Sequence, residues 1–194
     1  MRLDGGVVCL DFTNTIHNRY ALPVEDYIDT PERFYSWSAH AGAISRLEAH
    51  RIRAQREVPS DIVAEAAALR ASLYVLFTSA IAGRALPKDD VATLDRWVHR
   101  AWRRVSVDPA TPGGLCWANA TADARLPLLR IALSALSLLT SPTLSQVKQC
   151  EDTAACGWLF LDCTKNQRRR WCSMVTCGTL AKMRRYRQTQ AEEE

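Results

Sequence analysis

Apolar residues recur at helical spacing through much of the chain, and the clearest run follows Ser60. Its apolar positions lie three and four residues apart, and Gly83 and Pro87 follow it. This spacing gathers apolar side chains on one face of a helix, and glycine and proline are common where helices end. The run therefore predicts a core helix; its apolar positions are Ile62, Ala66, Leu69, Leu73, Leu76, Phe77, Ala80 and Ile81.

Four further segments carry helix signals. Thr30 before Pro31 is typical of a helix start, because proline at the first helical position gives up no hydrogen bond. The longest apolar run ends at Leu139; it is shorter than the roughly 20 residues that span a bilayer, and Arg130 interrupts it, so it predicts a buried helix in the middle of a bundle. The four helices are expected at Pro31 to about Gly42, Ala43 to Arg56, Asp89 or Asp90 to Arg104, and Leu126 to Leu139.

Two segments predict strands instead. Gly5–Thr15 is short, apolar and β-branched, and it lies between a glycine pair and an Asn/Thr cluster. Val105–Asn119 has turn residues between two apolar pieces and predicts a hairpin. Thr140–Gln146 contains a proline and is the natural linker. The expected fold class is α+β: a mostly helical N-terminal domain with a short β-sheet over residues 1–141, followed by a small module over residues 146–190.

Positive charge is concentrated in the C-terminal module. The chain carries 25 Lys and Arg against 21 Asp and Glu, a net charge of +4. Residues 1–147 hold 16 basic and 15 acidic residues, whereas residues 148–190 hold 9 and 3; the other three acidic residues are Glu192, Glu193 and Glu194 at the C-terminus. Such an asymmetry indicates a polyanionic partner for the basic segment, most often nucleic acid. A hydrophobic content of 47% and an N-terminus that does not resemble a leader predict a folded cytoplasmic protein.

Five of the seven cysteines also lie in this module. In a reducing compartment, clustered cysteines are more often metal ligands than disulfides. Two close pairs joined by a longer insert suit a tetrahedral zinc site, and so small a module gains folding free energy from the metal. We expect one structural zinc ion, with ordinary buried cysteines as the alternative. The expected ligands are Cys150, Cys156, Cys172 and Cys177.

The segments around the cysteines predict a finger. The insert between the two pairs contains a strand-like run, GWLFLD, and a returning segment, TKNQRRRW, which together predict a hairpin. A helix is expected after Cys177, so the module should be a treble-clef or ribbon-like zinc finger. Cys163 has no near partner and is expected to be a bystander.

The motifs CGWLFLD, RRRWCSMVTCG and AKMRRYR resemble the CGNR zinc-finger family of bacterial proteins. The segments GGVVCLDFTNT and DTPERFYSW resemble the ABATE-type domain that precedes this finger. The resemblance implies a two-part bacterial protein, regarded as a stress-related transcriptional regulator, with the same four cysteine ligands. One departure is clear: the family's Cys-Gly-Asn-Arg motif reads Cys177, Gly178, Thr179, Leu180 here, so the chain lacks that Asn and Arg.

Basic residues of the module are candidates for phosphate contacts, which supply most sequence-independent affinity for nucleic acid. The four cations of the expected final helix spread over much of its circumference, so no groove-facing side is predicted. Trp158 and Trp171 could stack on bases, although their position beside metal ligands favours packing inside the finger. A merely solvated cationic surface is the alternative, and DNA is favoured over RNA. The candidates are Arg168, Arg169, Arg170, Lys182, Arg184, Arg185 and Arg187.

Polar residues near the N-terminus indicate a second kind of site. Asp11, Asn14, Thr15 and Arg19, together with His17, could line a small-molecule pocket at the end of the predicted strand. The alternative is that Asp11 and Asn14 hydrogen-bond turns and caps. The sequence contains no nucleophile elbow, phosphate loop or dinucleotide fingerprint, so an enzyme is not expected.

Three classes of function stay open on the sequence. The favoured class is a nucleic-acid-binding regulator with a zinc finger, controlled by a small-molecule effector held in the front domain and compatible with a homodimer. The second is a sensor or enzyme whose chemistry lies in the front domain, with the finger as a structural or protein-interaction module. The third is an oligomeric scaffold.

Overall fold

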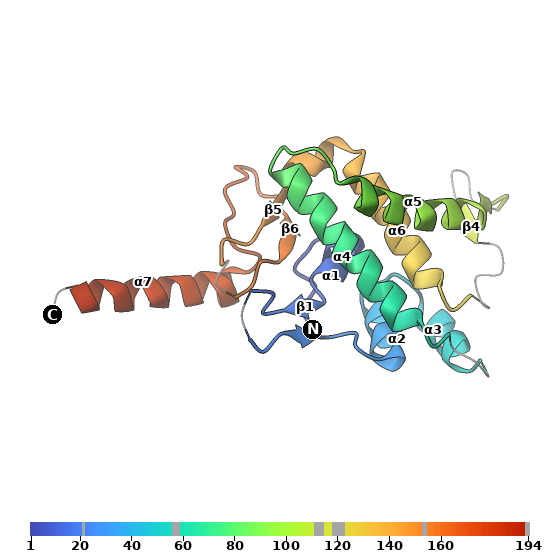
Figure 1. Ribbon diagram of the computed structural model, residues 1–194, viewed down its shortest axis with the longest axis horizontal. Coiled ribbons are helices and arrows are strands. Elements are labelled where there is room, and N and C mark those ends of the chain that lie inside the picture. The colour runs from blue at the N-terminus through green and yellow to red at the C-terminus, as the bar shows by residue number, and fades with distance from the viewer. Residues whose placement is uncertain (21, 56–58, 111–114, 118–122, 153–154, 193–194) are drawn as a thin grey trace.

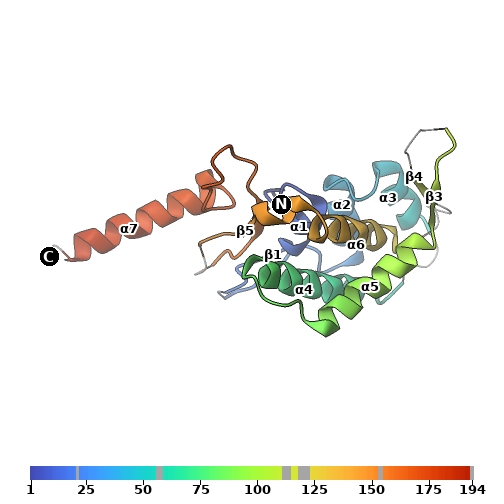
Figure 2. The same cartoon turned by 90° about the horizontal axis from the view of Figure 1, so that it is seen from above.

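The computed structural model describes residues 1–194 except residues 21, 56–58, 111–114, 118–122, 153–154 and 193–194. A 3₁₀ turn at Pro142–Gln146 and a π turn at Met174–Gly178 accompany the helices. The helices are α1 (Val8–Thr13), α2 (Pro31–His40), α3 (Arg46–Arg53), α4 (Ile62–Ile81), α5 (Lys88–Trp102), α6 (Leu126–Leu139) and α7 (Thr179–Glu192). Helices α1 to α6 form one body, and α7 extends away from it with the C-terminus at its far end (Figures 1 and 2).

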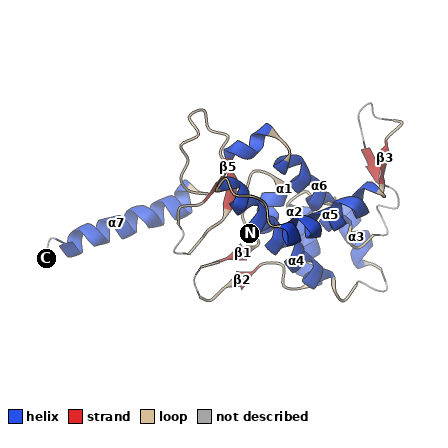
Figure 3. Ribbon diagram, turned by 45° about the horizontal axis from the view of Figure 1, so that its top comes forward, coloured by secondary structure: helices blue, strands red, loops and turns tan. Residues whose placement is uncertain are grey.

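The strands are short and pair as three separate antiparallel hairpins. The pairs are β1 (Ile16–His17) with β2 (Glu25–Asp26), β3 (Val105–Val107) with β4 (Leu115–Trp117), and β5 (Val147–Gln149) with β6 (Leu159–Leu161). The β3–β4 hairpin and α7 lie at opposite ends of the molecule (Figure 3). The structure confirms a mostly helical N-terminal region with small sheets, followed by a cysteine-rich module.

The core of the helical body lies between α4, α5 and α6, and α1 packs against both α4 and α6. As predicted, α6 is buried on most of its faces. Contrary to the expectation from the longest apolar run, α4 is long and apolar enough to cross a membrane, but half of its most apolar stretch is buried in the protein. It also carries the buried Arg70, whose guanidinium pairs with Asp26 of β2 at 2.5 Å. In this structure α4 is therefore a core helix.

Local capping explains where α2 and α3 begin. The Thr30 hydroxyl accepts a hydrogen bond from the Arg33 N–H at 3.2 Å, and Gly42 takes a φ of 74° after α2 ends. Ser45 and Glu48 form a reciprocal capping box, so α3 begins after Ser45 and not at Ala43. The helix ends at Arg53 with Ala54 as its C-cap, short of the predicted end at Arg56, which itself lies outside the described residues. The hairpin predicted between residues 105 and 119 is confirmed where the chain is described.

The prediction of a strand over Gly5–Thr15 is wrong, because its centre forms the short helix α1. Every residue from Cys9 to Thr13 is buried, so the segment is surrounded by protein on all sides. A run that is apolar all round has no periodicity to separate a buried helix from a buried strand. Tertiary packing against α4, α6 and β6 decides in favour of the helix.

Candidate metal centre and nucleic-acid interface

The β5–β6 hairpin holds the first cysteine pair. Cys150 follows β5 and its N–H donates to the Trp158 carbonyl at 2.7 Å, which closes the base of the loop. At the other end, the N–H of Cys156 donates to the Asp152 carbonyl at 2.8 Å, so the chain turns tightly before β6. Both cysteines are thereby held in the loop that joins β5 to β6.

The predicted hairpin between the two cysteine pairs is wrong in its pairing. Strand β6 pairs with β5 upstream, and residues 164–171 form no strand. Polar side chains hold this segment instead. The buried Asp162 carboxylate accepts from the Arg169 N–H at 2.9 Å and from the Lys148 ammonium at 2.7 Å, and Lys148 also donates to the Gln167 carbonyl. A segment so rich in charge lacks the alternating apolar positions that a strand would bury.

The second cysteine pair lies where this segment meets the final helix. Cys172 is buried at the end of the segment, and Cys177 lies in the π turn just before α7. The Ser173 hydroxyl caps this turn by accepting from the Thr176 N–H at 3.3 Å. The fourth sulfur is thus placed at the start of a helix, as the sequence predicts.

The four sulfur atoms of Cys150, Cys156, Cys172 and Cys177 all lie within 4.8 Å of one another, and all four residues are buried. The Sγ atoms of Cys156 and Cys172 are 3.6 Å apart, and those of Cys172 and Cys177 are 3.7 Å apart. A disulfide would need about 2.05 Å. A zinc ion with four sulfurs at about 2.3 Å requires sulfur–sulfur edges of about 3.8 Å. The donor set and its spacing fit one tetrahedral zinc ion.

The thiols perturb one another strongly at this spacing. Hydrogen bonding with Cys156 holds the pKa of the Cys150 thiol below its ordinary value, whereas hydrogen bonding with Cys150 raises the pKa of the Cys172 thiol. Four thiolates this close repel one another unless a cation neutralises them. When bound, a zinc ion supplies that charge and ties the hairpin, the segment and the final helix together; with four protein sulfurs it is a closed, structural site.

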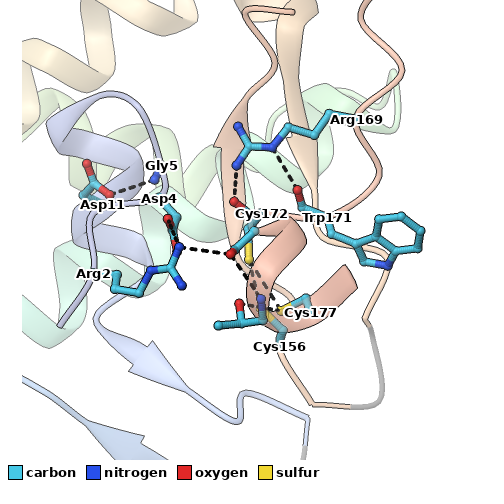
Figure 4. A network of polar contacts seen from close by, with 11 residues as sticks. Arg2, Asp4, Gly5, Asp11, Cys156, Arg169, Trp171, Cys172 and Cys177 are labelled. Atoms are coloured by element: carbon cyan, nitrogen blue, oxygen red, sulfur yellow. Dashed lines mark hydrogen bonds and ion pairs between the residues drawn. The ribbon is translucent and has the colours of Figure 1, made fainter. Parts of the chain in front are cut away.

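The finger is attached to the helical body through backbone groups of β6. The Asn14 side chain donates to the Leu159 carbonyl and accepts from the Leu159 N–H, both at 2.8 Å. Gly157 takes a φ of 65° and leaves no room for a Cβ atom beside the Tyr20 ring, which explains the glycine after Cys156. Arg2 donates to the Ser173 hydroxyl at 3.0 Å from the other side (Figure 4).

The side chains of the predicted small-molecule pocket form hydrogen bonds with other residues of the protein. Asp11 is buried and accepts from the Gly5 N–H at 2.8 Å, and Asn14 is bound to β6. The Thr15 hydroxyl donates to the Phe12 carbonyl and accepts from Arg70. Arg19 donates to the Thr13 carbonyl and stacks on Tyr74 at 3.8 Å from the ring centroid. Asp11 thus hydrogen-bonds the turn that precedes α1, whereas Asn14 bonds a strand and not a turn or cap.

The seven predicted nucleic-acid-binding residues divide into two groups. Arg169 donates to the carbonyls of Trp171 and Cys172 (Figure 4). Its guanidinium also lies over the Phe160 ring, so Arg169 supports the metal centre. Arg170 pairs with Glu151 at 2.5 Å and Arg184 pairs with Asp152 at 2.6 Å. The others are exposed and form no ion pair among the described residues; they are Arg168, Lys182, Arg185 and Arg187.

The two tryptophans of the finger also differ in their surroundings. Trp158 is buried beside the cysteines and its indole N–H donates to the Ile16 carbonyl at 2.8 Å, as the packing alternative predicts. Trp171 is half-buried and lies under the Arg170 guanidinium. Cys163 is exposed and lies outside the cluster of four, in agreement with its expected bystander role.

The fold and the cysteine cluster define a class: a helical protein with a C-terminal four-cysteine zinc finger. Two family models match the chain. The model of the ABATE family, described as "Putative stress-induced transcription regulator", matches residues 6–142, and that of the CGNR zinc finger matches residues 146–190. The first match spans more than half of the chain, so the chain belongs to the ABATE family and carries one structural zinc in its CGNR finger. A search of curated proteins finds no match.

Proposed function

We propose that the chain is a nucleic-acid-binding transcriptional regulator and not an enzyme. The observation that carries the proposal is a set of five exposed cations on the finger that form no ion pair with an acidic residue among the described residues: Lys165, Arg168, Lys182, Arg185 and Arg187. Exposed Lys and Arg side chains neutralise phosphates and release counterions, which supplies affinity for any nucleic acid. Residues 1–147 are nearly neutral by contrast, so the excess of positive charge lies in residues 148–190.

The zinc centre supports this surface indirectly. Cys177 anchors the start of α7, and the Arg184–Asp152 ion pair ties the first turns of α7 to the loop that holds Cys156. Both contacts depend on loops that the metal orders, so the direction of α7 follows from zinc binding. The description of the ABATE family as regulators is consistent with this role, which would place the protein in the cytoplasm.

The experiment measures the affinity of the full-length, zinc-loaded chain for nucleic acid at low salt and compares it with the affinities of two double variants. The variant Arg168→Ala/Arg187→Ala removes two exposed cations from the finger, and Arg84→Ala/Arg103→Ala removes two exposed cations from the helical body. We expect the first pair to weaken binding several-fold and to lower the salt slope by about 2, and the second pair to change neither. Equal affinities of both variants and the parent would refute the proposal.

A small-molecule effector site is a second candidate, because a cavity of about 700 Å³ lies between β2 and α2. Trp37 and Ser36 line one side of it, and Glu25 and Asp29 line another. It lies apart from the residues predicted from the sequence for such a pocket. Native mass spectrometry of the purified chain tests this candidate: a bound small molecule should be lost in Ser36→Trp, which fills the cavity, and its absence from the parent protein would count against the site.

A further inference from the structure

Helix α7 is a free-standing helix. It extends beyond the finger (Figures 1 and 2), and every residue from Lys182 to Gln190 is exposed. Among the described residues, α7 contacts the rest of the finger near its N-terminal end, through the π turn and the Arg184–Asp152 ion pair. A helix of 14 residues is only marginally stable in water without a packed face. This exposure is typical of a helix that finds its packing partner in another molecule.

One face of α7 differs from the rest. Met183, Tyr186 and Gln190 are spaced three and four residues apart and therefore share a face. Lys182 lies about 80° to one side of this face and Arg187 about 60° to the other, at 3.6 residues per turn. A hollow of about 260 Å³ on the helix surface is lined by four of these five residues, all except Gln190. The structure thus shows an uncharged strip between two cations.

The remaining basic residues of the helix lie elsewhere. Arg184 is engaged by Asp152, which removes it from the set available to a partner. Arg185 lies on the far side of the helix from the Met183–Gln190 strip. From the sequence, the four cations of this helix are too widely spread to define a side that faces a groove. When Arg184 and Arg185 are left out, the two that remain lie on either side of the strip.

We propose that α7 is a recognition helix that lies in the major groove of duplex DNA. Met183, Tyr186 and Gln190 would face the base edges, and Lys182 and Arg187 the phosphates on the two sides of the groove. The major groove is about 12 Å wide, and a helix with its side chains measures about 10–12 Å, so the fit is close. This inference rests on the proposed nucleic-acid-binding function and names its target.

The chemistry of the strip indicates what it reads. A glutamine side chain can bind adenine through two hydrogen bonds. Its amide N–H donates to N7, and its carbonyl oxygen accepts from the N6 amino group. Apolar side chains such as Met183 contact the thymine methyl group in the same groove. The strip should therefore favour sites that contain A·T pairs. Duplex RNA is a poor fit, since its major groove is too narrow and deep for side chains to read.

The experiment selects bound duplexes from a random DNA pool with the full-length, zinc-loaded chain and repeats the selection with two variants. Gln190→Ala removes the proposed adenine reader, and Gln188→Ala is the matched control, because it removes the same side chain from the opposite face of the same helix. We expect the preference for A·T at one or two positions to fall roughly tenfold in Gln190→Ala and to persist in Gln188→Ala. Zinc content and helicity of each variant check that it is folded.

A second arm tests the flanking cations. Lys182→Ala/Arg187→Ala should weaken binding to all duplex sequences alike and reduce the salt slope by about 2, without changing the preferred sequence. If the parent chain binds no nucleic acid at low salt, the proposed function itself fails. If it binds DNA but Gln190→Ala and Gln188→Ala select the same sequences, or if duplex RNA binds as tightly as duplex DNA, only the recognition-helix inference is overturned. If these variants differ from the parent chain in oligomeric state and bind DNA as the parent does, the strip is an interface with a second copy of the chain and the recognition-helix inference is overturned.

Discussion

Adjacent arginines in this protein have different roles, and their neighbours decide which. Arg168 is exposed, whereas the guanidinium of Arg169 donates to two backbone carbonyls beside the metal centre. Arg170 is paired with Glu151. Sequence composition treats the three residues as one basic cluster. The carbonyls and carboxylate that distinguish them become visible only when the chain is folded.

This difference predicts opposite effects for two neighbouring substitutions. Arg169→Ala leaves two carbonyls without their charged donor, and each such hydrogen bond contributes about 1.5–3 kcal/mol. We expect Arg169→Ala to lower the free energy of unfolding and to release zinc to a chelator more readily, whereas Arg168→Ala should leave both unchanged and weaken only nucleic-acid binding. Denaturant unfolding and chelator competition measure the two quantities. Equal stability of the two variants would contradict the assigned role of Arg169.

Asp11 predicts a pH dependence of stability. Burial raises the pKa of its carboxyl to about 6, although the hydrogen bond from the Gly5 N–H opposes the shift. Because the unfolded value is about 3.9, the folded state binds a proton that the unfolded state has lost, and stability falls as pH rises from about 4 through 6, by about 1.4 kcal/mol per pH unit. This contribution is fully present only below pH 4.

Asp11→Asn keeps an oxygen acceptor for Gly5 and removes the titration. Relative to the parent chain, the variant should gain about 1 kcal/mol of unfolding free energy between pH 5 and pH 7. Denaturant unfolding of both proteins at the two pH values measures the difference, and effects of pH on the zinc site cancel in the comparison. A difference that does not change with pH would show that the carboxyl titrates normally.

At the scale of elements, β6 belongs to two cores at once. Its alternation sends Leu159 toward the main core of the helical body and Phe160 toward the cysteine cluster. Asn14 of the segment after α1 binds both backbone groups of Leu159. The strand is therefore the element that couples the metal centre to the helical body.

Asn14→Ala should weaken this coupling. It leaves the buried N–H and C=O of Leu159 without partners, at a cost of about 1–3 kcal/mol for each group. We expect a loss of at least 2 kcal/mol in the free energy of unfolding, measured by denaturant titration of the zinc-loaded chain. Asn166→Ala, an exposed asparagine on the finger, is the matched control and should change stability little. A loss no larger than in the control would mean that β6 is held by other contacts.

Some elements of this fold carry local signals in the sequence and others do not. Helices with a clear apolar face or a cap, such as α2 and α4, were predictable because their signals are local. The segment of α1 was not, since it is buried on every side and carries no periodicity. The pairing of β6 with β5 was missed because the partner strand, Val147–Gln149, has only three residues and lies between the predicted linker and the first cysteine, where no strand was predicted.

At the scale of the whole molecule, the metal ligands could be predicted from the sequence, whereas the side-chain contacts around the metal centre could not. Cysteine spacing sufficed because metal geometry restricts which pairs can converge, and the four predicted sulfurs do converge. The partners of Asn14 and Arg184 could not be predicted, since β6 lies 145 residues from Asn14 and Asp152 lies 32 residues from Arg184. Such contacts depend on how the helical body and the finger pack together.

Because of this packing, the finger shares the hydrophobic core of the helical body and is not an independently folded module. Val147 and Leu159 of the β5–β6 hairpin are buried in the main core with residues of α1, α4 and α6. Loss of the metal would therefore disturb a strand that the helical body also uses. We expect zinc removal to lower the stability of the chain as one cooperative unit.

The most direct test of this account is X-ray absorption at the zinc edge on the purified full-length chain, with the metal content measured on the same sample. We predict one zinc per chain surrounded by four sulfur atoms at about 2.3 Å, because four buried thiols converge at the required spacing. Replacement of Cys163 by serine should leave the spectrum unchanged. A protein without zinc, or zinc bound by nitrogen or oxygen in place of these sulfurs, would contradict the centre that orders the finger and positions α7.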